Sequence, residues 1–130
     1  MYTKYLVTGA TGFLGRTLVR KLTERGFTVS ALVMKSDPLI HSLPDGISVF
    51  YGDITDRGFL DEAFQNTGRE YCVIHCAGMI SIASSPDKSI YRINVQGTEN
   101  IISLCRLHNV GKLIYVSSVH SIPEKPKGEI

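Results

Sequence analysis

The chain has 130 residues, of which 43% are hydrophobic and 20% are charged, and its formal net charge at pH 7 is +2. This length fits one domain that buries a sizeable core. The near balance of charge, with no cluster of lysines and arginines, excludes an electrostatic nucleic-acid site. No apolar run is long enough to form a membrane-spanning helix, so we expect neither nucleic acid nor membrane as a partner.

The three cysteines, at positions 72, 76 and 105, are an odd number and lack the spacing of a disulfide framework. Free thiols of this kind are typical of a reducing compartment. Residues 1–4 pass directly into an apolar run, so no cleavable signal is visible. We therefore expect a cytoplasmic protein.

The first half of the chain alternates between strand-like and helix-like segments. A short apolar run at 5–8 predicts a buried strand. Leucines then recur every four residues from Leu14 to Leu22, which predicts an amphipathic helix that begins at Phe13 and that Gly26 ends. The next two predicted strands are 27–33 and 47–51.

The second half continues the alternation. A helix is predicted from about Asp56 to Gly68, and an apolar run at 72–76 predicts a fourth strand. Residues 85–87 (Ser-Pro-Asp) combine a capping hydroxyl, a proline and an acid, which are typical of a helix start. The last two predicted elements are a helix from this start to about Asn109 and a strand at 112–117.

This order of elements predicts the α/β class, with a Rossmann-type doubly wound parallel sheet that carries helices on both faces. The right-handed crossover rule favours the strand order 3-2-1-4-5. The ending at 121–130 (SIPEKPKGEI) is polar, contains two prolines and is typical of a loop. We therefore expect a fold truncated after its fifth strand.

Three glycines stand between the first strand and the first helix, at Gly9, Gly12 and Gly15. We expect Gly9 to permit a tight turn, Gly12 to let the backbone approach a ligand, and Gly15 to let the helix pack on the strand. The free N–H groups and the dipole at the start of the helix would then favour a pyrophosphate. The alternative is a purely structural turn, because a G-x-x-G-x-x-G spacing by itself is a weak signal.

Five linked motifs identify a protein family more specifically than the glycine spacing does. The stretches TGATGFLG, GDITD, HCAG, NVQGTEN and YVSS follow one another along the chain. In this order they resemble the extended short-chain dehydrogenase/reductase family, most closely its dihydroflavonol-4-reductase-like and NAD-dependent epimerase/dehydratase branches. The resemblance implies that residues 1–130 are the N-terminal part of an NAD(P)-binding Rossmann domain, without the remaining strands and the substrate lobe.

The resemblance also implies a set of cofactor-binding residues. Thr11, Gly12, Phe13 and Leu14 match the family's pyrophosphate loop, and Asp53 matches the acid that accepts from the adenine amino group. The alternative for Asp53 is a cap on the next helix. The full set of cofactor-binding residues is Gly9, Thr11, Gly12, Phe13, Leu14, Gly15, Met34, Lys35, Asp53, Ile54, Cys76, Ala77, Gly78 and Ser117.

Two residues match catalytic positions of the family. Ser118 matches the serine that orients the substrate carbonyl or alcohol, and Asn94 matches a support for the proton-relay water. The alternative for Asn94 is a buried amide that backbone groups satisfy. We expect no metal site, because on a strand Cys72 and Cys76 face one side while His75 faces the other.

The family's catalytic Tyr-x-x-x-Lys pair does not occur among these 130 residues. The resemblance places that pair after the serine, and without it we expect this chain to be inactive on its own. The resemblance implies an oxidoreductase, epimerase or dehydratase that moves hydride between a nicotinamide cofactor and a carbonyl/hydroxyl substrate. The alternative is a non-catalytic NAD(P)-binding sensor of the same fold.

The choice between NADP and NAD depends on the end of the second strand. NAD-preferring relatives carry an acid there, whereas this chain has Met34 followed by Lys35. We therefore expect NADP, because Lys35 would attract a 2′-phosphate. NAD is the alternative, because the arginine that NADP-preferring relatives often carry at this place is absent. The expected partners are a small-molecule substrate and further copies of the same chain.

Overall fold

A computed structural model describes residues 2–35, 37–76 and 92–116 of the chain. Its centre is a five-stranded sheet in the order β3-β2-β1-β4-β5, and every pair of neighbouring strands is parallel. The strands are β1 (Lys4–Thr8), β2 (Thr28–Val33), β3 (Ser48–Tyr51), β4 (Tyr71–His75) and β5 (Lys112–Tyr115). The predicted strand order 3-2-1-4-5 is confirmed.

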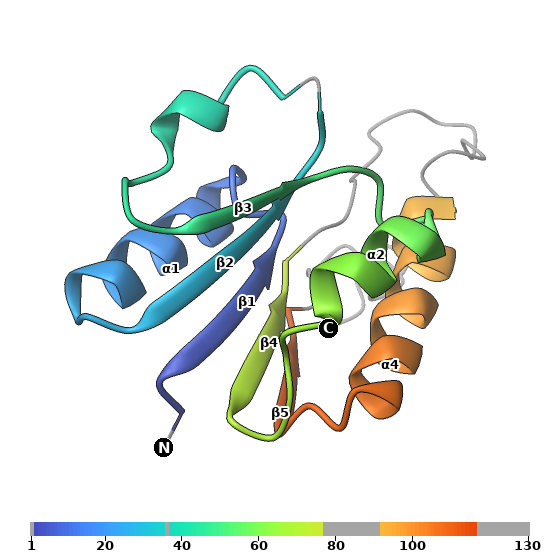
Figure 1. The fold of residues 1–130 in the computed structure, drawn as a ribbon. Coiled ribbons are helices and arrows are strands. Elements are labelled where there is room, and N and C mark those ends of the chain that lie inside the picture. The colour runs from blue at the N-terminus through green and yellow to red at the C-terminus, as the bar shows by residue number, and fades with distance from the viewer. Residues whose placement is uncertain (1, 36, 77–91, 117–130) are drawn as a thin grey trace, which may run out of the picture.

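The helices connect consecutive strands and cover both faces of the sheet (Figure 1). They are α1 (Phe13–Glu24), α2 (Arg57–Phe64) and α4 (Thr98–Leu107), with a short 3₁₀ turn η1 (Ile40–Ser42) and a π-helical turn η2 (Arg92–Gly97). Helix α1 lies on one face of the sheet, and α2 and α4 lie side by side on the other. This is the doubly wound arrangement that the alternation of elements predicts.

Two apolar clusters hold these layers together, one on each face of the sheet. On the α1 face, Val7 and Ala31 of the strands pack with Val19 of the helix. On the opposite face, Leu6 and Val73 pack with residues of α2 and α4. Leu6 and Val7, which are neighbours along β1, therefore point to opposite clusters. Both side chains are fully buried, as expected for a strand covered on both faces.

Two helices end in the same backbone motif, with different residues at its left-handed position. At the end of α1, Gly26 has φ of +80°, and the N–H of Phe27 donates to the carbonyl of Leu22 at 3.1 Å. At the end of α4, Asn109 takes that position with φ of +54°, and Val110 donates to Cys105 at 2.9 Å. Both are Schellman caps, which glycine and then asparagine favour. The helix ends predicted near these residues are confirmed.

The long helix predicted from residue 85 to Asn109 differs from the structure where it is described. Residues 92–97 form the π-helical turn η2, and regular α-helix begins only at Thr98. The start predicted at residues 85–87 lies outside the described residues. A π-turn adds a residue to each turn, so the regular helical spacing predicted from residue 85 onward does not hold there. Apolar spacing alone does not distinguish the two kinds of turn.

Across the part of the chain that the structure describes, no helix has the length and apolar character needed to cross a membrane.

Candidate functional site

Four loops with predicted site residues meet at one edge of the sheet. Gly9 follows β1, Met34 follows β2, Asp53 lies two residues beyond β3, and Cys76 follows β4. Because all four strands are parallel, their carboxyl ends lie at the same edge. The chain adds β2 and β3 on one side of β1 and then adds β4 and β5 on the other side. The order of the strands therefore reverses at β1. Such a switch point is where open α/β sheets bind ligands.

The turn from β1 into α1 is packed too tightly for a side chain at Gly15. Gly9 has φ of +62°, and its carbonyl accepts from the N–H of Gly12 at 3.1 Å. A Cβ on Gly15 would lie 2.1 Å from the Gly9 carbonyl oxygen, which no backbone adjustment of a few tenths of an ångström relieves. A Cβ on Gly12 would lie 3.3 Å from the same oxygen and is therefore less severely restricted.

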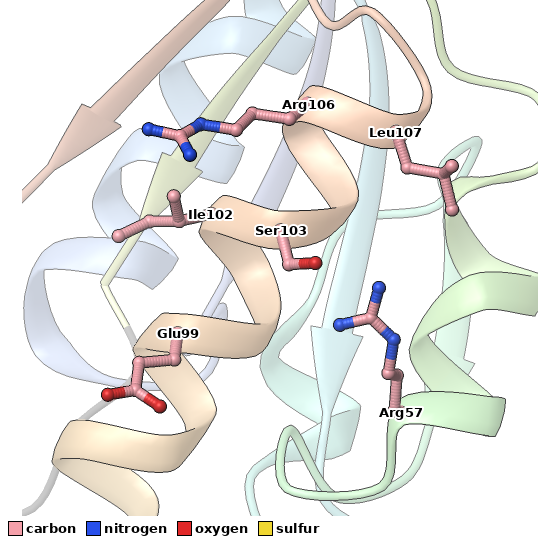
Figure 2. Close-up of a pocket in the computed structure, with 6 residues that line it drawn as sticks. All are labelled: Arg57, Glu99, Ile102, Ser103, Arg106 and Leu107. Atoms are coloured by element: carbon pink, nitrogen blue, oxygen red, sulfur yellow. The ribbon is translucent and has the colours of Figure 1, made fainter.

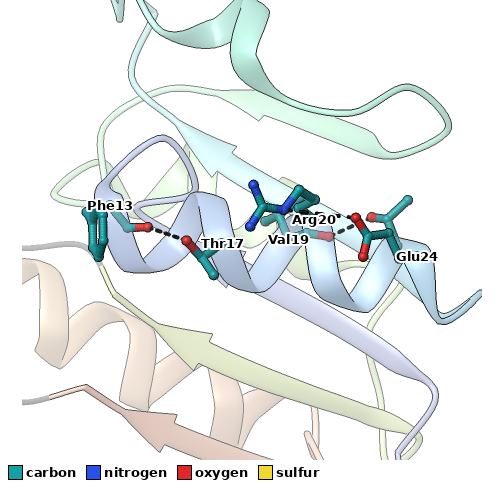
Figure 3. A network of polar contacts seen from close by, with 6 residues as sticks. Phe13, Thr17, Val19, Arg20 and Glu24 are labelled. Carbon is teal, nitrogen blue, oxygen red and sulfur yellow. Dashed lines mark hydrogen bonds and ion pairs between the residues drawn. The ribbon is translucent and has the colours of Figure 1, made fainter.

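The start of α1 leaves backbone N–H groups without a side-chain acceptor. Gly12 is the N-cap residue and makes no side-chain cap, and the first turn contains no acid. Phe13 and Leu14 are 84% and 43% exposed although both are large and apolar. Figure 3 shows Phe13 at this end of the helix, where its carbonyl accepts from the Thr17 hydroxyl at 3.0 Å. An uncapped helix start with an exposed first turn suits an anion such as a pyrophosphate.

The far end of α1 is held by contacts of its own. The Thr23 hydroxyl donates to the carbonyl of Val19 at 2.7 Å, and Arg20 pairs with Glu24 at 4.0 Å (Figure 3). Arg20 and Glu24 are both mostly exposed, so this pair adds little to stability. The side-chain contacts of α1 therefore leave its N-terminal turn available.

Asp53 forms a local turn beyond β3. Its Oδ1 accepts from both the backbone N–H and the hydroxyl of Thr55, each at 2.8 Å. The cap of α2 is instead Asp56, whose Oδ1 accepts from the N–H of Phe59 at 3.1 Å. The alternative in which Asp53 caps the helix is therefore wrong. Among the described residues Asp53 Oδ2 accepts no hydrogen bond, so it is an acceptor that a ligand amine could use.

Ile54, next to Asp53, is fixed by α4 and the turn before it. The Asn100 side-chain amide donates to the Ile54 carbonyl at 3.0 Å. A Cβ on Gly97 would lie 2.4 Å from Ile54 Cδ1, so Gly97 packs closely on a side chain that would have to move to admit a larger residue. Gly97 and Asn100 belong to the NVQGTEN motif. In this structure the motif therefore positions the predicted adenine loop, a role that the sequence did not indicate for Asn100.

The loop after β2 contains an acid that the sequence prediction missed. Met34 and Lys35 are exposed, as expected for residues at a ligand edge. Asp37 folds back, and its Oδ2 accepts a hydrogen bond from the hydroxyl of the buried Thr11 in the glycine-rich turn. Sequence reasoning examined only the strand end, whereas this acid lies within the turn that follows it.

A buried polar network joins the ends of β1 and β4 to α4. Thr8 Oγ1 lies 2.7 Å from His75 Nδ1 and accepts from the N–H of Cys76 at 3.0 Å. The other ring nitrogen, His75 Nε2, lies 2.9 Å from the hydroxyl of Thr98. A neutral imidazole has one donor and one acceptor nitrogen, and hydroxyl groups can match both. The network therefore ties the strand ends to the start of α4.

Burial lowers the pKa of His75 to about 4. The residue is 1% exposed, and its ring stacks on Tyr115 with 5.7 Å between centroids. Burial also raises the pKa of the thiols of Cys72 and Cys76. Cys72 packs in the cluster on the α1 face, whereas His75 points to α4, as strand alternation predicts. Within the described ranges no group of His, Cys, Asp and Glu is arranged to hold a metal.

The structure describes one of the two predicted catalytic residues. Asn94 is half-buried in the π-helical turn η2. The predicted residues Ala77, Gly78, Ser117 and Ser118 lie outside the described residues. The structure therefore brings together the predicted phosphate turn, the adenine loop and the end of β2.

A groove of about 530 Å³ lies elsewhere, on the outer side of α4 toward α2. Figure 2 shows Arg57 from α2 across from residues of α4. The groove contains none of the predicted site residues. We place the site at the strand ends, because the tight glycine turn and the uncapped helix start are found there. The groove is lined by Arg57, Glu99, Ile102, Ser103, Arg106 and Leu107.

Known proteins are similar to this chain in both sequence and fold. A model of the 3-beta hydroxysteroid dehydrogenase/isomerase family matches residues 6–130. Sterol demethylase protein B of Methylococcus capsulatus is 34% identical over 125 residues, 95% of this chain and 37% of that protein. Mouse 3 beta-hydroxysteroid dehydrogenase type 7 is 33% identical over 131 residues, 95% of this chain and 35% of that protein.

A solved structure shows the same fold. The UDP-glucose 4-epimerase of Thermus thermophilus, in complex with NAD, matches with a TM-score of 0.81 and 30% identity, over 97% of this chain and 41% of that one. The chain thus spans between 35% and 41% of the length of these three relatives. The five motifs, the sheet order and the family match all agree, and the chain belongs to the 3-beta hydroxysteroid dehydrogenase/isomerase family of extended short-chain dehydrogenases/reductases.

Proposed function

We propose that this chain is the dinucleotide-binding part of an enzyme that moves hydride between a nicotinamide cofactor and a carbonyl/hydroxyl substrate. The observation that carries the proposal is the uncapped start of α1 behind the close-packed turn at Gly9, Gly12 and Gly15. Family membership supports it, as does the NAD named with the Thermus epimerase. The whole enzyme's substrate class is part of the proposal.

The residues that are present fit a dinucleotide. The N–H groups that follow Gly12 would hold the pyrophosphate, and the open Oδ2 of Asp53 would accept from the adenine amino group. Asn100 and Gly97 would keep that loop in place through Ile54. When bound, the nicotinamide supplies or accepts the hydride. Ser118 and Asn94 would act on the substrate oxygen and the proton-relay water, as the family resemblance implies.

For the cofactor, Lys35 supports NADP. It is exposed directly after β2, where its ammonium group would attract a 2′-phosphate. The preference for NADP is thus a proposal that depends on one flexible side chain. The turn beyond it contributes the opposite charge of Asp37.

Dinucleotide binding can be tested at Gly12. We expect wild-type protein to enhance the fluorescence of NADH and NADPH, and Gly12→Val to abolish the enhancement. The physical reason is that the branched side chain would fill the space above the first-turn N–H groups. Gly12 has φ of −68°, a conformation open to any residue, so the variant should keep a circular dichroism spectrum near wild type.

A matched control is Gly46→Val, in an exposed turn with open space at its Cβ position. Its φ of +83° strains a branched residue, so it should lower stability without removing binding. Normal NADH binding by Gly12→Val would refute the assignment of the pyrophosphate to this turn.

We also propose a homo-oligomer in the cytoplasm. Ile102 and Leu107 on the outer side of α4 are 38% and 62% exposed, and Arg106 and Glu99 flank them. In a two-fold interface the acid of one copy can meet the arginine of the other. The three cysteines are unpaired, in agreement with a reducing compartment.

A further inference from the structure

We infer that Asp37 opposes the attraction of Lys35 for a 2′-phosphate, so that its carboxylate, and not the residue that ends β2, limits how strongly this chain prefers NADP. The inference rests on the proposed dinucleotide site. It assigns a specificity role to a residue that neither the motifs nor the strand end indicated.

The first step is the position of the carboxylate. Asp37 Oδ2 accepts from the hydroxyl of Thr11, which is 7% exposed within the glycine-rich turn. A charge therefore lies in hydrogen-bond contact with the loop that would hold the cofactor. Asp37 also lies about 20 residues beyond that loop, the distance at which acids that bind the ribose hydroxyls occur in this fold.

The second step is that the carboxylate is held in place. Asp37 Oδ1 accepts from the N–H of Leu39 at 2.8 Å, and the N–H of Asp37 donates to the carbonyl of Met34 at 3.2 Å. Oδ1 thus holds the side chain against its own turn, while Oδ2 contacts Thr11. By contrast, Lys35 is exposed on a long side chain and forms no ion pair within the described residues.

The third step is charge. Within the described residues the close pairs of opposite charge are Lys4–Glu70, Arg20–Glu24 and His108–Asp61, and Asp37 belongs to none of them. The nearest charge along its own turn is Lys35, and no contact joins the two. An aspartate without a cationic partner repels a phosphate within the screening length. The same carboxylate accepts hydrogen bonds from hydroxyl groups, which NAD has at this part of its ribose.

The test compares dissociation constants of NADH and NADPH by fluorescence for wild type and three variants. Asp37→Asn removes the charge and keeps polar atoms beside both Thr11 and Leu39. We expect this variant to lower the ratio of the NADPH dissociation constant to the NADH dissociation constant about tenfold. An effect of this size is typical when one like charge is removed from near a charged group. The change should shrink at 1 M salt, where screening is strong.

Two further variants make the test specific. Asp45→Asn removes the same charge from an exposed loop position between β2 and β3 and should leave the ratio unchanged. Lys35→Glu should raise the ratio, because it weakens NADPH more than NADH. Thermal melting of each variant shows whether it is folded.

The outcomes separate the two proposals. If wild type binds both dinucleotides and Asp37→Asn leaves the ratio unchanged, the role of Asp37 is refuted and the dinucleotide site stands. An equal shift with Asp45→Asn would refute it as well, since the effect would then be one of net charge. If wild type binds neither dinucleotide, the proposed function fails and the inference falls with it.

Discussion

Gly12 and Gly15 stand three residues apart in one turn, and the structure gives them different reasons to be glycine. The Gly15 position has no room for a Cβ, because the Gly9 carbonyl oxygen would be 2.1 Å away. The Gly12 position is less crowded, at 3.3 Å from the same oxygen, and it opens toward the exposed first turn of α1. Gly15 therefore serves the packing of helix on strand, whereas the proposed role of Gly12 is the approach of a ligand.

His75 makes the stability of the chain depend on pH. Burial lowers its pKa to about 4 in the folded chain, against an ordinary value near 6.5. The unfolded chain therefore binds more protons between these values, so stability is fully present above pH 6.5 and is lost as pH falls toward 4. We expect His75 to contribute a loss of about 2 kcal/mol between pH 7 and pH 4.5.

Urea unfolding of wild type and His75→Gln at several pH values measures this loss. The variant should be less stable at pH 7 and should lack the His75 part of the decline toward pH 4.5. His41→Gln is the control, because it removes an exposed imidazole instead of the buried one. Parallel declines in wild type and His75→Gln would show that His75 is not the titrating group.

Among the elements, α4 has two faces with different tasks. Its inner face is fully buried through Ile101 and Leu104, and Thr98 at its start bonds to His75. Its outer face exposes Ile102 and Leu107 beside the groove shown in Figure 2. Both side chains line this groove, and exposed apolar side chains around a groove are typical of an interaction surface.

The exposed face of α4 predicts self-association. We expect wild type to show a dimer by sedimentation at micromolar concentration, and Leu107→Glu to shift it toward monomer by placing a charge in the interface. Leu39→Glu is a matched control, because Leu39 is 46% exposed on the loop before η1, away from this face. A wild type that stays monomeric at high concentration would contradict the proposal.

The edge of strand β5 is a second surface through which the chain could self-associate. Within the described residues it pairs only with β4, and its Ile114 and Tyr115 are 39% and 53% exposed. An open strand edge can pair with another chain. Association that persists in Leu107→Glu and is lost in Ile114→Lys would assign the interface to this edge instead of α4.

At the scale of the whole molecule, no Tyr-x-x-x-Lys pair occurs in these 130 residues. We expect the purified chain to bind NADH and yet to show no turnover with carbonyl substrates, because a positioned acid typically contributes about 10²–10⁴-fold. The measurement is NADH absorbance with a panel of carbonyl compounds, on samples whose binding has been shown. Turnover that Gly12→Val abolishes would mean that another residue supplies the proton.

The sequence by itself determined the order of the elements and the place of the tight glycine-rich turn. Apolar periodicity and the glycines carry this information locally: a buried parallel strand is apolar throughout, and a helix ends where Gly26 adopts a positive φ. The crossover rule then leaves few sheet orders, and the observed 3-2-1-4-5 is among them. These features depend on neighbours in the chain or on chirality that all such folds share.

The tertiary structure alone decided which side chains share the site. Asp37 reaches Thr11 across 26 positions of sequence, and Asn100 reaches Ile54 across 46. The π-helical turn before Thr98 also escapes the sequence, because it shifts the register without changing the apolar pattern. Contacts of this kind arise when parallel strands bring distant loops to one edge of the sheet, and no local pattern encodes which of their side chains then meet.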